Sequence, residues 1–236
     1  MGQALLMAIL ALWLSVGVGP TAAAPPGARG ALEIRRAEWP AWRLPAPLPR
    51  PARGDLVYPP WFAGDWRVSS WEVGAAPETA VCWVVRFRPA PAGGVVGERA
   101  ANARAVGQAL LGEALLEVLD DPGNPNRQLA RLSGERSLES TVVGRRSEHP
   151  AGDPGVFLAD ELVLQVLRGP GDPRINRIET LSRYERRGEA EHTWIEAEQW
   201  QARYPSPARG LVATGTGTGR WRLRLDPLPP ESDPAS

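Results

Sequence analysis

Two carboxylates flanked by indoles form the pattern in this sequence that most resembles a reaction centre. Four residues alternate along one stretch and so share one face of a strand: Trp194, Glu196, Glu198 and Trp200. Carboxylates two residues apart on a strand are separated by about 7 Å, within the range that glycosidases use. The intervening Thr193, Ile195 and Ala197 form an apolar face, which predicts that they point inward and leave both carboxylates solvated. We therefore expect no sugar chemistry at this strand.

Other signatures of catalysis are weak. His149 and His192 are the only histidines, lie far apart and have no neighbouring cysteine, so no zinc site is expected. The glycine-rich run 215–219 precedes a strand instead of a helix, which favours a hairpin tip over a dinucleotide loop. Nucleophile elbows and phosphate-binding loops are absent from the sequence. These patterns predict a protein that is not an enzyme and uses no cofactor or metal; a barrel-type isomerase or cyclase is an alternative.

Four charged residues are candidates for ligand binding. Strand alternation places them inside the domain or at its rim: Arg99, Arg127, Glu161 and Glu179. A buried arginine must be paired, because an isolated buried charge is costly. The simpler interpretation is a set of internal arginine–glutamate pairs. The functional interpretation is an arginine that holds an acidic ligand, such as a fatty acid or a tetrapyrrole propionate.

The balance of charge limits the expected partners. Lysine is absent, so all 27 basic residues are arginines, and 27 acidic residues balance them. Zero net charge gives no overall attraction to nucleic acid, so no nucleic-acid partner is expected. Cys82 is the single cysteine, so the chain has no internal disulfide.

The first residues are typical of an export signal. An apolar run over residues 4–18 is followed at residues 21–24 by small residues of the kind that a signal peptidase accepts. We expect residues 1–24 to be removed. The mature chain is expected to have no membrane span, because no stretch approaches the roughly 20 apolar residues that a span requires.

Proline-rich segments flank one folded domain. Residues 25–55 carry spaced prolines, which remove hydrogen-bond donors and favour a linker or a strap over the domain, docked by Trp39 and Trp42. Residues 226–236 are expected to form a disordered tail. The folded domain is therefore predicted to span residues 56–225.

Period-two alternation dominates this domain and predicts strands. The expected strands cover residues 66–73, 81–88, 95–99, 128–132, 138–146, 156–167, 175–186, 192–203 and 220–225. One long helix is expected over residues 102–119, capped by Asn102, with Val106 and Leu110 toward the sheet and Arg104 and Gln108 in solvent. Short, turn-rich spacers make neighbouring strands antiparallel. The predicted fold is mainly β: an antiparallel lipocalin-like (calycin) β-barrel of about eight strands with one long α-helix.

The entry to the first long strand resembles that of the lipocalins. Gly64-Asp-Trp66 matches the Gly-x-Trp motif that opens the first barrel strand in that family. The resemblance implies that Gly64 permits the bend into the barrel and that Trp66 plugs the closed end. It also implies that a basic residue of the last strand, Arg220 or Arg222, covers the indole in a cation–π contact.

A wider resemblance covers most of residues 56–225. The stretches that carry it are Tyr58-Pro-Pro-Trp-Phe-Ala-Gly-Asp-Trp-Arg-Val68, residues 95–102, Asn124-Pro-Asn-Arg127, residues 157–161 and residues 178–180. They are similar to an uncharacterised domain family of cyanobacteria and chloroplasts, whose members are exported to the periplasm or thylakoid lumen. The resemblance implies that location and no particular activity.

The leading functional hypothesis is an exported soluble binding protein that carries a small hydrophobic or amphipathic ligand in the periplasm or thylakoid lumen. The alternative is an assembly or interaction module, whose strap and exposed tryptophans contact a membrane (photosynthetic) complex. A cavity of roughly 300 Å³ or more favours the carrier. A filled core with an exposed apolar patch favours the interaction module.

Overall fold

A computed structural model describes residues 30–51, 54–90, 93–150, 152–189 and 192–229. The predicted signal segment, residues 1–24, lies outside the described residues, as do residues 230–236 of the predicted tail. The remainder of that tail begins in a strand, because the last strand runs to Pro227 and Leu228 N donates to Asp65 O at 2.9 Å.

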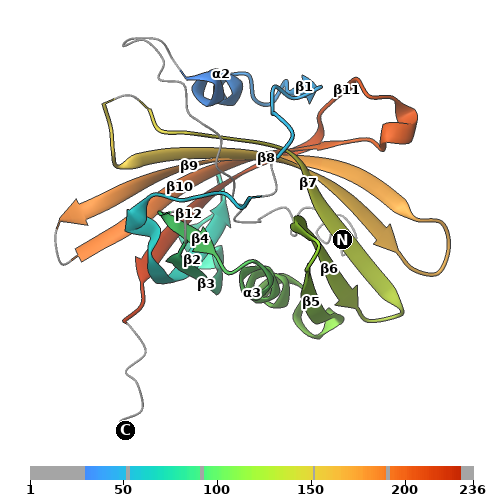
Figure 1. The fold of residues 1–236 in the computed structure, drawn as a ribbon, viewed down its shortest axis with the longest axis horizontal. Coiled ribbons are helices and arrows are strands. Elements are labelled where there is room, and N and C mark those ends of the chain that lie inside the picture. The colour runs from blue at the N-terminus through green and yellow to red at the C-terminus, as the bar shows by residue number, and fades with distance from the viewer. Residues whose placement is uncertain (1–29, 52–53, 91–92, 151, 190–191, 230–236) are drawn as a thin grey trace, which may run out of the picture.

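One ten-stranded antiparallel sheet makes up most of the molecule (Figure 1). Its strands are β2 (Gly64–Glu72), β3 (Val81–Pro89), β4 (Val95–Gly97), β5 (Leu115–Asp121), β6 (Asn124–Leu132), β7 (Arg136–Glu148), β8 (Val156–Arg168), β9 (Arg174–Glu189), β10 (His192–Tyr204) and β12 (Thr216–Pro227). The spatial order is β4-β3-β2-β12-β10-β9-β8-β7-β6-β5. The sheet curls strongly into a half-barrel that is not closed, so the predicted closed barrel of about eight strands is wrong.

The two edges of the sheet are not hydrogen-bonded to each other, and the helix α3 (Arg99–Leu111) fills the gap between them (Figure 1). On one side, the Asn102 side chain donates to Arg86 O at 3.0 Å and accepts from Arg86 N at 2.8 Å, so it joins α3 to β3. On the other side, Gly107 permits close contact, since a Cβ there would lie 2.6 Å from Leu115 of β5. The two apolar clusters that flank α3 are thereby held together.

The predicted helix over residues 102–119 is too long at its C-terminal end. Gly112 has φ 54° and ends α3, a short 3-10 turn η3 (Gly112–Ala114) follows, and β5 begins at Leu115. Leu115 and Val118 are buried by the sheet, so their helical spacing was a coincidence of two apolar patterns. Asn102 lies inside the first turn of α3 and does not cap it. Arg104 and Gln108 are exposed, as predicted.

The proline-rich segment is a strap over the convex face of the sheet. It contains α2 (Ala31–Ala37) and β1 (Arg43–Leu44), and β1 pairs with β11 (Ala213–Thr214). Trp42 is fully buried, and its carbonyl accepts from Gly215 N at 2.9 Å. The strap then passes the edge of β7, where Arg145 N donates to Pro49 O at 2.9 Å. It covers the part of β7 beyond the bulge at residues 142–144, which β6 does not pair.

Three further 3-10 turns lie at the ends of strands, and an aromatic cluster fills one end of the half-barrel. The turns η1 (Pro60–Phe62) and η2 (Pro77–Thr79) flank β2, and η4 (Pro207–Arg209) follows β10. The aromatic cluster comprises Tyr58, Phe62, Phe87, Phe157 and Tyr184, with ring centroids 4.7–6.3 Å apart. Phe157 is the second residue of β8, so the opposite ends of β7–β10 form the other end of the half-barrel.

Candidate functional site

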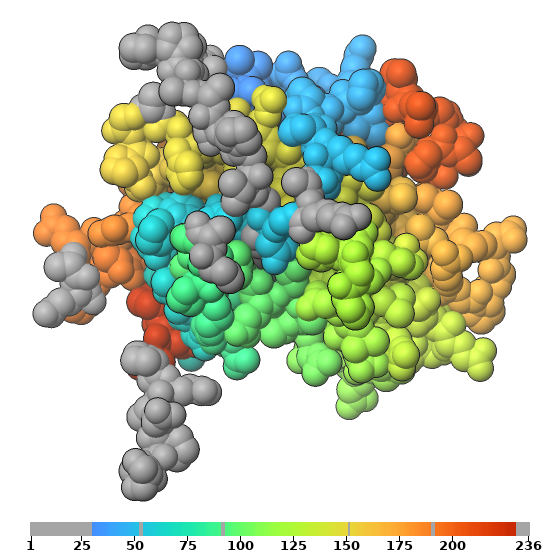
Figure 2. All heavy atoms as spheres, in the orientation of Figure 1, coloured from blue at the N-terminus to red at the C-terminus, as the bar shows by residue number. Residues whose placement is uncertain are grey.

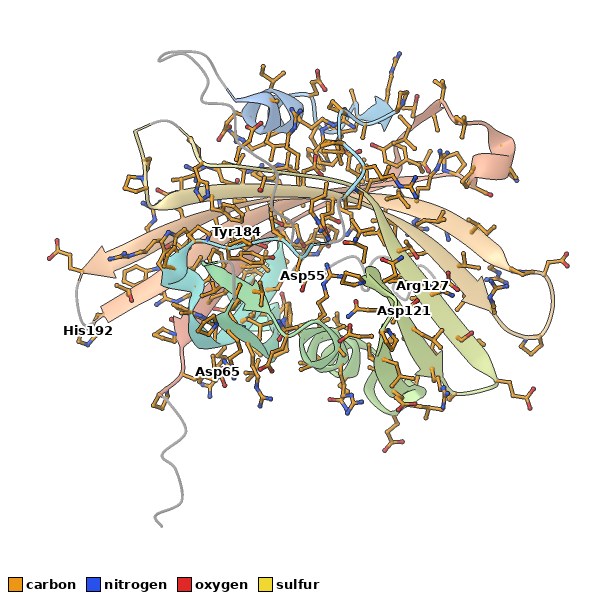
Figure 3. The ribbon with its side chains drawn as sticks, in the orientation of Figure 1. Asp55, Asp65, Asp121, Arg127, Tyr184 and His192 are labelled. Carbon is orange, nitrogen blue, oxygen red and sulfur yellow. The ribbon has the colours of Figure 1, made fainter. Side chains whose placement is uncertain are left out.

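Paired charges are buried under the concave face of the sheet. Arg99 Nε lies 2.6 Å from Asp55 Oδ1 of the strap, and Arg99 also donates to Pro125 O. Arg145 of β7 pairs with Glu161 of β8, and both side chains are almost completely buried. Figure 3 shows Asp55 between the sheet and α3. Glu161 is therefore inside, as strand alternation predicts. Arg99 is also inside, but it begins α3, so the predicted strand over residues 95–99 is two residues too long. Each has a partner from the protein itself.

The electrostatics of this interior are dominated by burial. Burial raises the pKa of Asp55, and the nearby charges of Arg99 and Arg145 offset this only in part. Burial also raises the pKa of Tyr58 well above its usual value and that of Tyr184 to about 12. Both phenols are therefore neutral near neutral pH. The two ion pairs, Arg99–Asp55 and Arg145–Glu161, link the strap, α3 and the sheet, which gives them a structural role.

Glu179 lies on the convex face, under α2, and not inside the half-barrel. Its neighbours Ile178 and Thr180 take the concave positions of β9. Arg35 of α2 donates to both Glu179 oxygens at 2.8 Å, and Tyr204 donates to Oε2. Burial and the charge of Glu179 raise the pKa of the adjacent Asp160 well above its ordinary value. This Arg35 cluster (Arg35, Asp160, Glu179 and Tyr204) attaches the strap to the sheet.

Arg127 is a surface residue, which corrects its predicted place inside or at the rim. It pairs with Asp121 at 3.3 Å, which lies beside it in Figure 3, and with Glu139 at 2.9 Å. Asn126 and Gln128 take the buried positions of β6. The ion pairs with Glu139 raise the pKa of the Arg127 guanidinium.

The Gly-x-Trp motif opens β2, but the predicted cation–π contact is wrong. Gly64 has φ 109°, and Trp66 is buried with its indole nitrogen donating to Phe62 O at 2.7 Å. Arg220 instead covers Trp200 on the convex face, at 5.3 Å from the ring centroid. Arg222 shares that face and lies 3.7 Å from Glu198. The indole of Trp66 points to the other side of the sheet, where neither guanidinium reaches.

The paired carboxylates that open the sequence argument lie on the convex face, as expected. Ile195 and Ala197 point into the core, while Glu196 pairs with Arg187 at 3.1 Å and Glu198 with Arg220 at 2.8 Å. Each of these two carboxylates is therefore paired with an arginine of the protein itself.

A hollow of about 800 Å³ lies at the ends of β7–β10, opposite the aromatic cluster. We call it the mouth. In an antiparallel meander every second connection falls at the same end, so the β6–β7 turn, the β8–β9 turn and the segment after β10 come together here. Its lining contains five arginines and one acidic residue: Arg136, Arg168, Arg174, Arg203, Arg209 and Asp172.

Three of these arginines have no carboxylate partner within the described part of the chain: Arg136, Arg168 and Arg209. The Arg136 side chain packs closely against glycines of two turns. A Cβ on Gly169 would lie 2.7 Å from Arg136 Cγ, and a Cβ on Gly134 would lie 3.3 Å from its Nη2. Arg136 Nε also donates to Ser133 O at 3.3 Å. The mouth therefore presents three guanidinium groups that no carboxylate of the described residues pairs with, and one of them, Arg136, is packed against two turns.

Polar side chains continue from the mouth along the concave face. Leu167 and Asn176 line the hollow, and Gln165 follows Leu167 on the same face of β8, about 7 Å further in. Gln165 is fully buried, and neither its side-chain oxygen nor its nitrogen has a hydrogen-bond partner. Ser140, opposite Gln165 on β7, is buried with an unpartnered hydroxyl. A group bound here would be expected to form hydrogen bonds.

Sequence reasoning missed the mouth because its arginines resemble ordinary solvated turn residues. The signal that could have found it is positional: arginines flank alternate connections of the predicted meander. Across the described residues, no helix is long and apolar enough to cross a membrane, and no three His, Cys, Asp or Glu side chains are grouped to hold a metal.

A family model described as Domain of unknown function (DUF6816) matches residues 51–216. The chain belongs to the DUF6816 family. The matched part of this DUF6816 protein runs from the end of the strap to the start of β12 and contains every residue that lines the mouth. No curated protein and no solved structure matches the chain.

Proposed function

We propose that this protein is an exported, non-catalytic binding protein that takes a small amphipathic anion at the arginine-lined mouth. The observation that carries the proposal is the hollow of about 800 Å³ in which five arginines accompany one aspartate. Small-molecule sites commonly have volumes of about 300–1,000 Å³. The guanidinium fork pairs with carboxylate and phosphate through two hydrogen bonds, so an anionic head group suits this lining better than a neutral one.

The rest of the lining favours a short amphiphile over a long apolar chain. Leu167, Ile175 and Pro205 supply apolar contacts beside the arginines. Deeper in, Gln165 and Ser140 present unpartnered polar atoms, and an alkyl chain laid against them would leave those atoms unsatisfied. A bridging water can satisfy those deeper atoms, while the head group of the ligand stays with the arginines. The ligand is therefore held at the rim of the half-barrel.

The test is a calorimetric titration of the mature protein with ten-carbon amphiphiles that differ only in charge. Decyl phosphate and decanoate should bind, and decanol and decyltrimethylammonium should not. Arg136→Gln should weaken decyl phosphate by about ten-fold, the value of one charge-assisted hydrogen bond. Arg104→Gln, on the exposed side of α3, is the matched control and should change nothing. Equal affinity for decanol and decyl phosphate would refute an anion site. Mass spectrometry of small molecules that co-purify with native protein would identify the natural ligand.

Export to a periplasm or thylakoid lumen is part of this proposal. Its support is the apolar run at residues 4–18 followed by small residues. N-terminal sequencing of native protein should begin at residue 24 or 25. A native protein that retains Met1 would contradict export by this signal.

A second candidate function is an interaction module for a membrane protein complex. The convex face beyond the strap has a groove of about 550 Å³, in which half-buried Trp71 lies among alternating arginines and glutamates of β9, β10 and β12. A photocrosslinking residue in place of Trp71 should then capture one membrane protein in cells. Equal capture from position 116, an exposed apolar site on β5, would indicate non-specific contact.

A further inference from the structure

The most exposed aliphatic side chains among the large hydrophobic residues of the described ranges lie beside the mouth. Leu211 and Val212 follow Arg209, and they are 75% and 76% exposed. No other large hydrophobic side chain in the described ranges exceeds 64%. Figure 2 shows this segment, in orange-red at the upper right, beside the lighter orange β8–β9 turn that forms another part of the rim.

The loop that carries the two aliphatic residues is held in a fixed shape. Arg177, which is buried, donates to Pro205 O at 2.9 Å, Gly210 O at 3.1 Å and Leu211 O at 3.3 Å. Immediately after the loop, β11 pairs with β1 of the strap. The protein therefore uses a buried guanidinium to hold an apolar pair out in solvent, where exposure is unfavourable unless something covers it.

We propose that this end of the molecule docks on the surface of an anionic lipid bilayer, with Leu211 and Val212 inserted at the head-group boundary and the mouth arginines against lipid phosphates. Apolar side chains beside clustered positive charge are the combination by which peripheral proteins bind anionic bilayers. Arg209 is two residues from Leu211, and Arg136 and Arg168 lack carboxylate partners within the described ranges.

A second copy of this chain fits the surface less well. A symmetric dimer through this end would place five arginines opposite five arginines, and like charges across an interface repel. A stable protein interface also buries about 1,200 Å² or more, whereas only two strongly exposed aliphatic side chains are present here. Membrane insertion needs no such area, because the charges supply the rest of the attraction.

This inference does not rest on ligand uptake into the mouth, and the two ideas fail separately. Flotation of the mature protein is compared between vesicles of phosphatidylcholine alone and vesicles that also contain phosphatidylglycerol. We expect binding to the anionic vesicles, weakened by salt. Leu211→Ser combined with Val212→Ser should reduce binding by about ten-fold or more through lost apolar insertion. Arg209→Gln should reduce it by about five-fold.

Controls and ligand titration separate the possible outcomes. Leu116→Ser and Arg104→Gln remove an exposed leucine and an exposed arginine from other parts of the surface and should leave vesicle binding unchanged. The Leu211/Val212 variant should still bind decyl phosphate, since neither residue lines the mouth. Vesicle binding that survives in that variant, or equal binding to uncharged vesicles, overturns the docking proposal. So does a concentration-dependent dimer that the same variant abolishes.

Discussion

Removing the guanidinium of Arg35 tests whether the strap is part of the cooperative fold. Arg35 makes two hydrogen bonds to Glu179, and the two side chains are 5% and 0% exposed. Arg35→Met would leave a buried carboxylate beside Asp160 without compensation. Breaking a buried ion pair in this way costs about 3–5 kcal/mol. With a urea dependence of about 2 kcal/mol per molar, the midpoint of unfolding should fall by about 2 M.

The assay is urea unfolding of the mature chain at neutral pH, followed by tryptophan fluorescence. Arg36→Met is the matched control, because Arg36 pairs with Glu33 near the surface and its loss should cost less than about 1 kcal/mol. Replacing both partners, as in Arg35→Met with Glu179→Leu, should recover most of the stability. That double variant keeps the test decisive if Arg35→Met does not fold. Equal midpoints for the wild type and Arg35→Met would refute coupling of the strap to the sheet.

Four further substitutions test other parts of the structure. Asp160→Asn should have the same urea midpoint as the wild type below about pH 4 and a higher midpoint at neutral pH. The reason is that a carboxyl whose pKa is raised in the folded state loses its stabilising contribution as the pH rises toward that pKa. A difference between the two midpoints that stays the same at every pH would contradict this. Trp66→Ala should cost about 3–5 kcal/mol and Arg222→Ala less than about 1 kcal/mol; thermal unfolding that gives similar losses would support the cation–π contact that the structure lacks. Gly112→Ala should destabilise by about 1 kcal/mol or more, since φ is 54° there; a gain in melting temperature would instead support the longer helix.

Most strands could be read from the sequence because one face of each is buried. In β3, for example, Trp83, Val85 and Phe87 are buried while Arg86 and Arg88 are not, and the same alternation is visible in the residue order. The boundary between α3 and β5 was missed because Val106, Leu110, Ala114 and Val118 satisfy helical spacing across a glycine that ends the helix. The positive φ of Gly112 and the short turn η3 that follows it separate the two elements.

The side of the sheet that a charge faces was harder to predict than the strand that carries it. Glu179 is buried, as a charged residue in an apolar strand suggests, but its burial comes from the strap on the convex face. In the sequence, residues 25–55 show no strong periodic pattern that would reveal such a cover. The prediction for Arg127 was wrong for a different reason. Its neighbours Asn126 and Gln128 are polar, so the alternation of hydrophobicity did not indicate which residues of β6 face inward.

The position of α3 argues against the idea that this helix acts as a gate to the interior of the half-barrel. A lid must leave its seat at low cost, yet α3 contributes Val106 to one apolar cluster and Ala103 to the other, and Asn102 is bonded to the backbone of β3 in both directions. Moving it would open both clusters. None of its residues lines the mouth, which lies at the far ends of β7–β10. If the mouth binds the proposed anion, that ligand can enter and leave while α3 stays in place. Its rate of exchange should then depend on the loops that carry Arg136 and Arg209 and should be insensitive to substitutions on the exposed face of α3 such as Gln108→Asp.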